Sequence, residues 1–310
     1  MMRYFGNGPY CYSNAVSMLL SSTGEEVSPS LVEVLTGVGH GPVFYEERSQ
    51  LFYFGDCHMP PDSGITAAMT ELGFDFIETA CDSDDSPPLD RLASALKNGP
   101  AILGPLDMSL LKYNPSHKYL RGADHFVLAY NMDERHAYLH DPEGFPFVQL
   151  PIEDLVAAWR ADSVDYKRGH YRCWHSPSRT RHPSTEDLTD VAMEQIKVAY
   201  SRMESVESVK TGNDATFLLL AALMSDPISG SLKSHLLNFA LKLAARRAGD
   251  YAEFFRESWP VLSDLKYEQA VLLGRCQSNG ANDDWSTVAD DLRTLSELEE
   301  RIRRSVMEQS

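Results

Sequence analysis

The stretch that decides the fold is His125-Phe126-Val127-Leu128-Ala129-Tyr130, followed by a polar turn and by Ala137-Tyr138-Leu139-His140-Asp141. Two short apolar runs on either side of a polar turn predict a β-hairpin. In a hairpin the first residue of one strand lies beside the last residue of the other. We therefore expect His125 and Asp141 at the same edge of a sheet, although 16 positions separate them. A carboxylate there can hold one imidazole nitrogen and leave the other free to take a proton.

A thiol that could use such a base lies near the start of the chain. Cys11 follows the turn-forming Gly6-Asn7-Gly8-Pro9 and precedes residues 12–20, in which apolar side chains recur near helical spacing. The cysteine is therefore predicted to sit where a helix begins. At that position the helix dipole and the backbone N–H groups favour a thiolate and can bind an oxyanion. Nucleophile, base and orienting acid together predict covalent acyl chemistry.

This arrangement resembles papain-like cysteine enzymes, and within them the family of the N-terminal domain of butirosin biosynthesis protein H, over roughly residues 8 to 150. The resemblance implies a papain-like domain followed by a helical C-terminal region. It assigns Cys11, His125 and Asp141 to the nucleophile, the base and the orienting acid. It also implies an acyltransferase of antibiotic biosynthesis, which takes an aminoacyl group from a carrier-protein thioester and passes it to an aminoglycoside amine.

One position departs from the pattern of that family. Papain-like enzymes carry a Gln six residues before the nucleophile to help bind the oxyanion, and this chain has Phe5 there. Asn7 is the nearest amide, but it stands in a different register, so backbone N–H groups at Cys11 or Tyr12 would have to serve. The further candidates for the oxyanion site, the substrate site or the lining of the cleft are Tyr10, Tyr12, Asn7, Asp107 and Asp124.

Each of these residues also has an ordinary structural interpretation. A single cysteine in an apolar helix is commonly a packed small hydrophobe, and His125 alone could be a structural histidine. An aspartate before proline, as at Asp141, is commonly a turn residue or helix cap, and Asp107 and Asp124 could be turn or surface carboxylates. The joint order and spacing favour catalysis. Two alternatives stay open, namely a peptidase or amidase with the same catalytic residues and a catalytically degenerate papain-like binding protein.

Composition narrows the class of partner. Acidic residues outnumber basic ones 45 to 28, for a net charge of −17, which repels phosphate and argues against nucleic acid. The same charge would attract a small cationic amine as acceptor. The family resemblance implies an acyl carrier protein or another thioester as donor. The 5 cysteines lack the spacing of a zinc site or disulfide framework, so we expect no metal and no cofactor. No apolar run is long enough to span a membrane, and we expect a cytoplasmic protein.

The pattern along the chain predicts two domains. We expect an α+β catalytic domain over residues 1–175, in which the helix carrying the thiol packs on an antiparallel sheet. Residues 176–185 are polar, contain proline and lack apolar periodicity, so they are predicted to be a linker. In the first domain the predicted elements are a helix starting after Ser28, helices at 63–72, 89–97 and 152–160, and strands at 101–103 and 145–150.

Residues 186–310 are predicted to form an all-helical C-terminal domain. Its expected helices cover 188–203, 215–224, 230–248, 251–273 and 284–307. The apolar run 218–223 should be buried. The last helix is amphipathic, and its apolar face could cap the chain's own bundle or pair with a second copy in a homodimer. That face is made by Leu292, Leu295, Leu298 and Ile302.

Overall fold

The computed structural model describes residues 2–6, 8–45, 51–56, 58–82, 85–202, 209–211 and 228–308. The chain divides into two compact units, of which the first comprises Met1–Val32 and Pro61–Pro183 and the second Glu33–Pro60 and Ser184–Ser310. The second unit resumes at Ser184, inside the predicted linker. It also takes in residues 33–60, which the sequence analysis assigned to the catalytic domain. Helix α2 (Pro29–Thr36) contains the point where the chain passes from one unit to the other.

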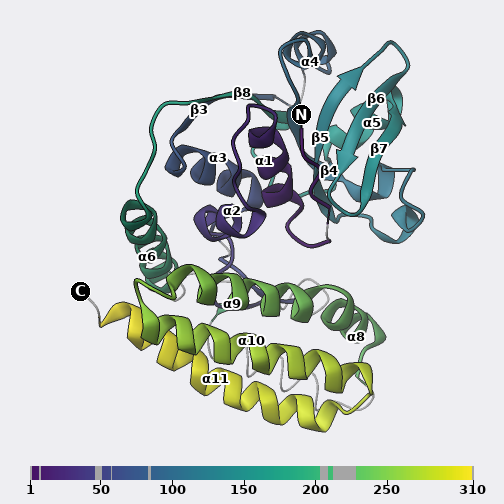
Figure 1. The fold of residues 1–310 in the computed structure, drawn as a ribbon. Helices are drawn as coiled ribbons and strands as arrows, with labels where there is room; N and C mark the ends of the chain where they lie inside the picture. The colour runs from purple at the N-terminus through teal and green to yellow at the C-terminus, as the bar shows by residue number, and fades with distance from the viewer. Residues whose placement is uncertain are drawn as a thin grey trace. The chain divides into compact units, whose positions relative to one another are not determined.

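A six-stranded antiparallel sheet forms the centre of the first unit, with the strand order β3-β8-β4-β5-β6-β7 (Figure 1). Its strands are β3 (Phe74–Cys81), β4 (Ala101–Asp107), β5 (Asp124–Met132), β6 (His136–Asp141), β7 (Phe145–Pro151) and β8 (His170–Arg179). Strands β5 and β6 are the predicted hairpin, in which Leu128 lies opposite His140. The mixed α+β class with an antiparallel sheet is therefore confirmed.

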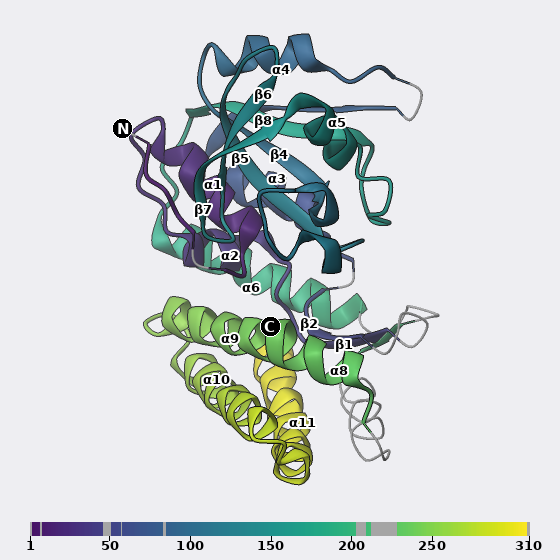
Figure 2. The ribbon, with the colours of Figure 1, turned by 90° about the vertical axis from the view of Figure 1, so that its right-hand side faces the viewer.

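Helices cover both faces of this sheet. They are α1 (Cys11–Ser21), α3 (Pro61–Glu71), α4 (Leu89–Leu96) and α5 (Ile152–Arg160), with short 3-10 turns η1 (Met108–Leu110) and η2 (His117–Tyr119). Phe126 of β5 meets Tyr12 of α1, with ring centroids 6.1 Å apart. The next residue, Val127, is buried in a cluster with Trp159 of α5. Since successive strand side chains point to opposite faces, α1 and α5 lie on opposite sides of the sheet (Figure 2).

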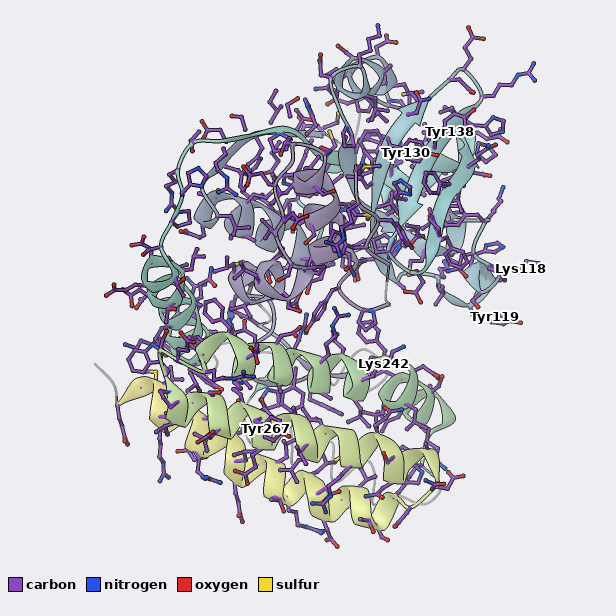
Figure 3. All side chains as sticks on the ribbon, in the orientation of Figure 1. Lys118, Tyr119, Tyr130, Tyr138, Lys242 and Tyr267 are labelled. Atoms are coloured by element: carbon purple, nitrogen blue, oxygen red, sulfur yellow. The ribbon has the colours of Figure 1, made fainter. Side chains whose placement is uncertain are left out.

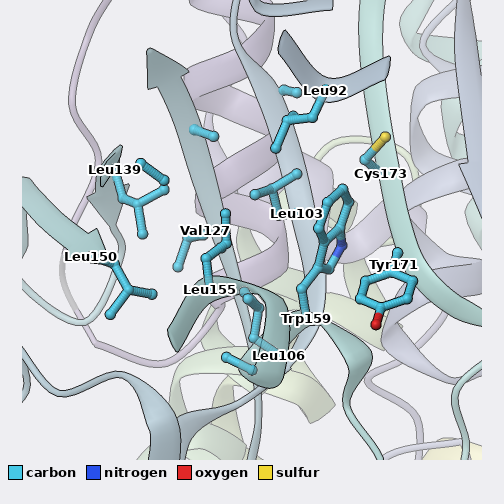
Figure 4. Close-up of a cluster of buried hydrophobic side chains, with 14 of the residues drawn as sticks. Leu92, Leu103, Leu106, Val127, Leu139, Leu150, Leu155, Trp159, Tyr171 and Cys173 are labelled. Carbon is cyan, nitrogen blue, oxygen red and sulfur yellow. The ribbon is translucent and has the colours of Figure 1, made fainter. Parts of the chain in front are cut away.

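The hydrophobic core beneath α5 holds the central strands in place. Figure 4 shows Leu155 and Trp159 of α5 among Leu103, Leu106 and Val127 of the sheet, all of which are buried. The indole N–H of Trp159 donates to the carbonyl oxygen of Arg172 at 2.7 Å, so its polar atom is satisfied in the core. Strands β4 and β5 therefore have a fixed position, and the residues at their ends are held with them.

Strands β3 and β8 were not predicted, and β8 covers part of the expected linker. Residues 170–174 are buried or half-buried, but residues 175–179 alternate between half-buried and exposed, which weakens the apolar signal. Ser176 and Pro177 lie at a bulge, because Asp75 pairs with Ser178 whereas Ile77 pairs with His175. A bulge tolerates proline, which has no N–H to donate to the ladder. Residues 176–179 of the predicted linker therefore belong to a strand, whereas residues 180–184 have no regular secondary structure.

The second unit combines a small sheet with helices. The sheet has the order β2-β1-β9, formed by β1 (Pro42–Tyr45), β2 (Leu51–Phe54) and β9 (Val209–Thr211). The helices are α6 (Thr185–Arg202), α8 (Gly230–His235), α9 (Leu241–Phe255), α10 (Pro260–Ala281) and α11 (Trp285–Met307), with a π-helical segment η3 (Leu236–Ala240) between α8 and α9. The C-terminal region is thus helical as predicted, apart from the short β9, which corrects the all-helical expectation.

Two predictions for the second unit had different outcomes. The predicted helix at 215–224 and its buried run lie outside the described residues. The apolar face of α11, in contrast, is buried within the chain itself, with Leu292 and Ile302 fully buried. That face packs against the chain's own helices and is not open to a second copy.

Candidate active site

The thiol of Cys11 is placed by the turn that leads into α1. Cys11 is the first residue of the helix, and the preceding Tyr10 has a φ of 85°, in the left-handed region. The backbone N–H of Gly8 donates to the carbonyl oxygen of Pro142 at 3.4 Å. The residues before Cys11 are therefore tied to the loop that follows Asp141, which holds the first turn of α1 beside the end of the hairpin.

His125 and Asp141 are in direct contact at the end of the hairpin. The Nε2 atom of His125 lies 2.6 Å from Oδ1 of Asp141, and the two side chains are only 3% and 0% exposed. The imidazole also hydrogen-bonds the Cys11 thiol. Because Asp141 occupies Nε2, that bond uses Nδ1. The sulfur additionally accepts a hydrogen bond from the backbone N–H of Phe126. The structure therefore brings together the three residues that the sequence analysis selected.

Asp141 is held by donors that the sequence analysis missed. Its Oδ2 accepts from the hydroxyl of Tyr113 at 2.7 Å, and its Oδ1 accepts from the backbone N–H of Glu143 at 2.7 Å. The hydroxyl of Tyr4 donates to the carbonyl oxygen of Asp141 at 2.7 Å. Tyr113 begins the polar loop before β5, and this position close to His125 in the sequence was the only local indication that it contacts the site. Tyr119 of the same loop is 89% exposed and points to solvent (Figure 3).

The protonation of the site follows from burial and from these contacts. Burial alone would lower the pKa of His125, but the charge and hydrogen bond of Asp141, with a contribution from Cys11, raise it well above the ordinary value. Burial raises the pKa of the Cys11 thiol, and the hydrogen bond and charge of His125 lower it only in part. Burial would likewise raise the pKa of Asp141, but His125 and the donors lower it. A stronger base than ordinary imidazole thus faces the thiol.

The two aspartates proposed to line the cleft have different roles. Oδ1 of Asp107 accepts from the backbone N–H of Ser109 at 2.8 Å, which caps η1, and its Oδ2 accepts from the hydroxyl of Ser163. Asp107 is therefore an anchor within the fold. Asp124 accepts from the hydroxyl of Tyr166 at 2.7 Å, and its charge acts on both Cys11 and His125. Of the two, Asp124 is the one at the thiol.

Phe5 lies far from the thiol. It lines a pocket with Arg3, Ser21 and Val27, and Arg3 lies over its ring with the guanidinium carbon 5.2 Å from the centroid. Ser21 is the last residue of α1, and its hydroxyl oxygen accepts from the backbone N–H of Arg3 at 2.9 Å. At a rise of about 1.5 Å per residue, this end of the helix is roughly 15 Å from Cys11. The N-terminal segment therefore runs back along α1, and position 5 does not face the site.

The oxyanion site then depends on the backbone at the start of α1. The side chains of Tyr10 and Tyr12 are buried, at 2% and 6% exposure, and Tyr12 packs on Phe126. These rings therefore serve the core. Asn7 lies outside the described residues. The backbone N–H groups of Cys11 and Tyr12, in the first turn of the helix, are the remaining predicted donors for an oxyanion.

Other types of site find little support in the described part of the chain. No group of three or more His, Cys, Asp and Glu side chains there could hold a metal ion. Cys11, Cys81, Cys173 and Cys276 are free thiols, and Cys57 lies outside the described residues. No helix in the described ranges has both the length and the apolar character needed to cross a bilayer.

Asp141→Asn should lower the rate of Cys11 acylation by about tenfold, less than His125→Ala, which removes the base. The amide oxygen can still accept from Nε2 of His125, and the amide N–H can donate to Tyr113, whose hydroxyl also accepts. Because Asp141 raises the pKa of His125, its loss should move the titration of that ring, followed by NMR, to lower pH.

Glu143→Gln is the matched control for this pair. Glu143 is exposed and lies two positions from Asp141, so the charge change is the same while only its backbone takes part in the site. It should leave the acylation rate and the titration of His125 unchanged. If His125→Ala were as active as Glu143→Gln, His125 would not be the base.

Comparison with known proteins shows similarity over the full length of both units. The chain is 39% identical over 307 residues to the "Uncharacterized protein YobF" of Bacillus subtilis (strain 168), and the alignment covers 99% of each chain. Residues 207–307 match the family model described as the YobF C-terminal domain. That match contains helices α8 to α11, whereas Cys11, His125 and Asp141 lie in the part covered by the full-length similarity alone.

Proposed function

This chain belongs to the YobF family, and we propose that it is a cysteine-dependent acyltransferase that forms an acyl-enzyme on Cys11 and passes the acyl group to an amine. The observation that carries the proposal is the contact series from the Cys11 thiol through His125 to Asp141. A thiol at a helix start, a base held by a buried carboxylate and a nearby backbone donor are the parts that nucleophilic acyl transfer needs. The same arrangement supports a papain-like fold for the first unit.

The chemistry has two steps that use the same groups. In the first, His125 takes the proton of Cys11, and the sulfur attacks the carbonyl carbon of a thioester. The backbone N–H of Cys11 stabilises the oxyanion, and the donor thiol leaves with the proton from His125. In the second, an amine attacks the acyl-enzyme, His125 takes a proton from its nitrogen, and Cys11 leaves as the thiol. Asp141 keeps the imidazole oriented and stabilises its protonated form in both steps.

The donor and acceptor follow from the resemblance to the butirosin biosynthesis protein H family and from charge. An aminoacyl thioester is the proposed donor and a small amine the proposed acceptor, within antibiotic biosynthesis in the cytoplasm. The net charge of −17 disfavours the docking of an acidic carrier protein but favours a cationic amine. A small diffusible thioester is therefore the simplest donor with which to test the reaction.

Intact-mass spectrometry with the glycyl thioester of N-acetylcysteamine tests this function. We expect the protein to gain the mass of one glycyl group on Cys11 and to lose it when an amine is added, with the corresponding amide as product. Release of free glycine at a rate that no amine changes would support the second candidate, a peptidase or amidase, which shares the same residues. A protein that gains no mass would be a degenerate binding protein of the same fold.

A further inference from the structure

A carboxylate and a phenol stand beside the proposed nucleophile and have no part in the steps above. Asp124 is the residue before His125 at the start of β5, and its Oδ2 accepts from the hydroxyl of Tyr166 at 2.7 Å. The charge of Asp124 acts on the Cys11 thiol, and Tyr166 is close enough to interact with both. Cys11, Asp124 and Tyr166 each keep part of their surface exposed to solvent.

Tyr166 is fixed in this position by the two anchors of its loop. The loop 161–169 connects α5 to β8, and Ser163 near its start donates to Oδ2 of Asp107. Near its end the Nε of Arg168 donates to Oδ2 of Asp62 at 3.1 Å, and a second guanidinium nitrogen donates to the Asp62 carbonyl at 2.9 Å. Asp62 is fully buried. A side chain held between two such anchors is preorganised to hold Asp124.

The charges near the thiol do not balance. The pKa of Tyr166 is raised well above its ordinary value by burial and by Asp124, so the phenol stays neutral. Burial also raises the pKa of Asp124 from 3.8, but its hydrogen bond to Tyr166 and the charge of His125 oppose that rise. The single imidazole of His125 thus lies beside two carboxylates, Asp124 and Asp141. Whether or not this imidazole carries a proton, at most one positive charge stands against two negative charges, and a cationic group entering the site is favoured.

We propose that Asp124, positioned by Tyr166, determines the specificity of the site by binding an ammonium group of the substrate next to Cys11. This inference rests on the proposed function and names the substrate class, since it requires a positive charge close to the reacting carbon or nitrogen. An aminoacyl donor carries such a charge next to its carbonyl carbon. A polyamine acceptor carries it near the attacking nitrogen. Neutral and anionic acyl groups gain nothing from Asp124.

The charge preference of Cys11 can be measured without acyl transfer. Two methanethiosulfonates, one bearing a trimethylammonium group and one a neutral methyl group, convert the thiol to a mixed disulfide and release methanesulfinate. Peptide mapping gives the second-order rate at Cys11 for each reagent, and the ratio of rates cancels any change in thiol pKa. Asp124→Asn should lower the ratio of cationic to neutral rates by about fivefold, because a unit charge a few ångströms away is removed.

Three further variants make the measurement specific. Asp75→Asn changes the same charge at an exposed position on β3 and should leave the ratio unchanged. Tyr166→Phe keeps the carboxylate but removes the hydrogen bond that positions it, so the ratio should fall by about twofold, which is less than in Asp124→Asn. If Asp124→Asn does not fold, Asp124→Ser replaces it, because the serine hydroxyl is smaller than the amide and can still hydrogen-bond Tyr166. Asp124→Ser should lower the ratio of cationic to neutral rates as Asp124→Asn does.

Glycyl and acetyl thioesters then identify which substrate carries the charge. If Asp124→Asn slows acylation by the glycyl compound but not by the acetyl compound, the ammonium group belongs to the donor. If it slows only the capture of the acyl-enzyme by a diamine, the group belongs to the acceptor. An unchanged rate ratio in folded Asp124→Asn overturns this inference while the acyl adduct on Cys11 still stands. A Cys11 that reacts with the methanethiosulfonates but forms no acyl adduct overturns the proposed function instead.

Discussion

Cys11→Ala is expected to abolish acyl-adduct formation completely while the protein keeps its fold. The thiol is the only nucleophile that His125 contacts in the proposed mechanism, and no hydroxyl or amine replaces it in the variant. The change removes one sulfur from a half-buried position at a helix start, so little packing is lost. Intact mass after incubation with the glycyl thioester measures the adduct, and circular dichroism with urea denaturation measures the fold.

Cys276→Ala provides the matched control for this prediction. Cys276 lies in α10 of the second unit, is fully buried, and has a pKa raised to about 12, mainly by burial. A thiol of that kind stays protonated and does not react. The Cys276 variant should therefore form the same adduct as the unmodified protein. An adduct that persists in Cys11→Ala would assign the acyl group to another residue and end the present mechanism.

Glu33→Ala is expected to cause the largest loss of stability. Nε of Arg247 lies 2.8 Å from Oε1 of Glu33, with the two side chains 7% and 0% exposed. Arg247 also donates to the carbonyl oxygen of Phe54. Without Glu33 the guanidinium stays buried and loses its counter-charge, which typically costs about 3–5 kcal/mol. Urea denaturation followed by circular dichroism measures the change in the free energy of unfolding.

Two comparisons distinguish the cost of leaving a buried charge unpaired from the cost of breaking an ordinary ion pair. Glu268→Ala breaks the bridge to Arg301, whose partners are 46% and 58% exposed, and should cost less than about 1 kcal/mol. Replacing both Glu33 and Arg247 with methionine removes the two charges together, and this variant should recover most of the stability. A loss in Glu33→Ala no larger than that in Glu268→Ala would contradict the expected burial cost.

The elements that could be predicted from the sequence are those with strong local signals. The hairpin of β5 and β6 has two apolar runs around a polar turn, and α1 follows a glycine and proline turn, so the positions of Cys11, His125 and Asp141 could be inferred. In β8, half-exposed residues and a bulge at Ser176 and Pro177 removed the periodic signal. These two features explain why β8 was not predicted from the sequence.

The parts of the site that could not be predicted depend on distant pairs. Tyr166 is 42 positions from Asp124, and Tyr4 is 137 positions from Asp141, so no local pattern links them. A buried hydroxyl donor carries no signature of its own in a single sequence. The sequence alone showed that Phe5 takes the place of the usual Gln, but not that the chain there runs to the other end of α1.

The interleaving of the two units along the chain sets an order for folding during synthesis. The first unit is complete in sequence once residue 183 has left the ribosome, whereas residues 33–60 belong to a unit that also needs the 127 residues from Ser184 to Ser310. Glu33 in particular waits for Arg247, which is made 214 residues later. In a nascent chain that pauses before α9, the Glu33 carboxylate, which is buried in the folded protein, therefore lacks the guanidinium of Arg247. Assembly of the second unit thus depends on the synthesis of residues 184–310.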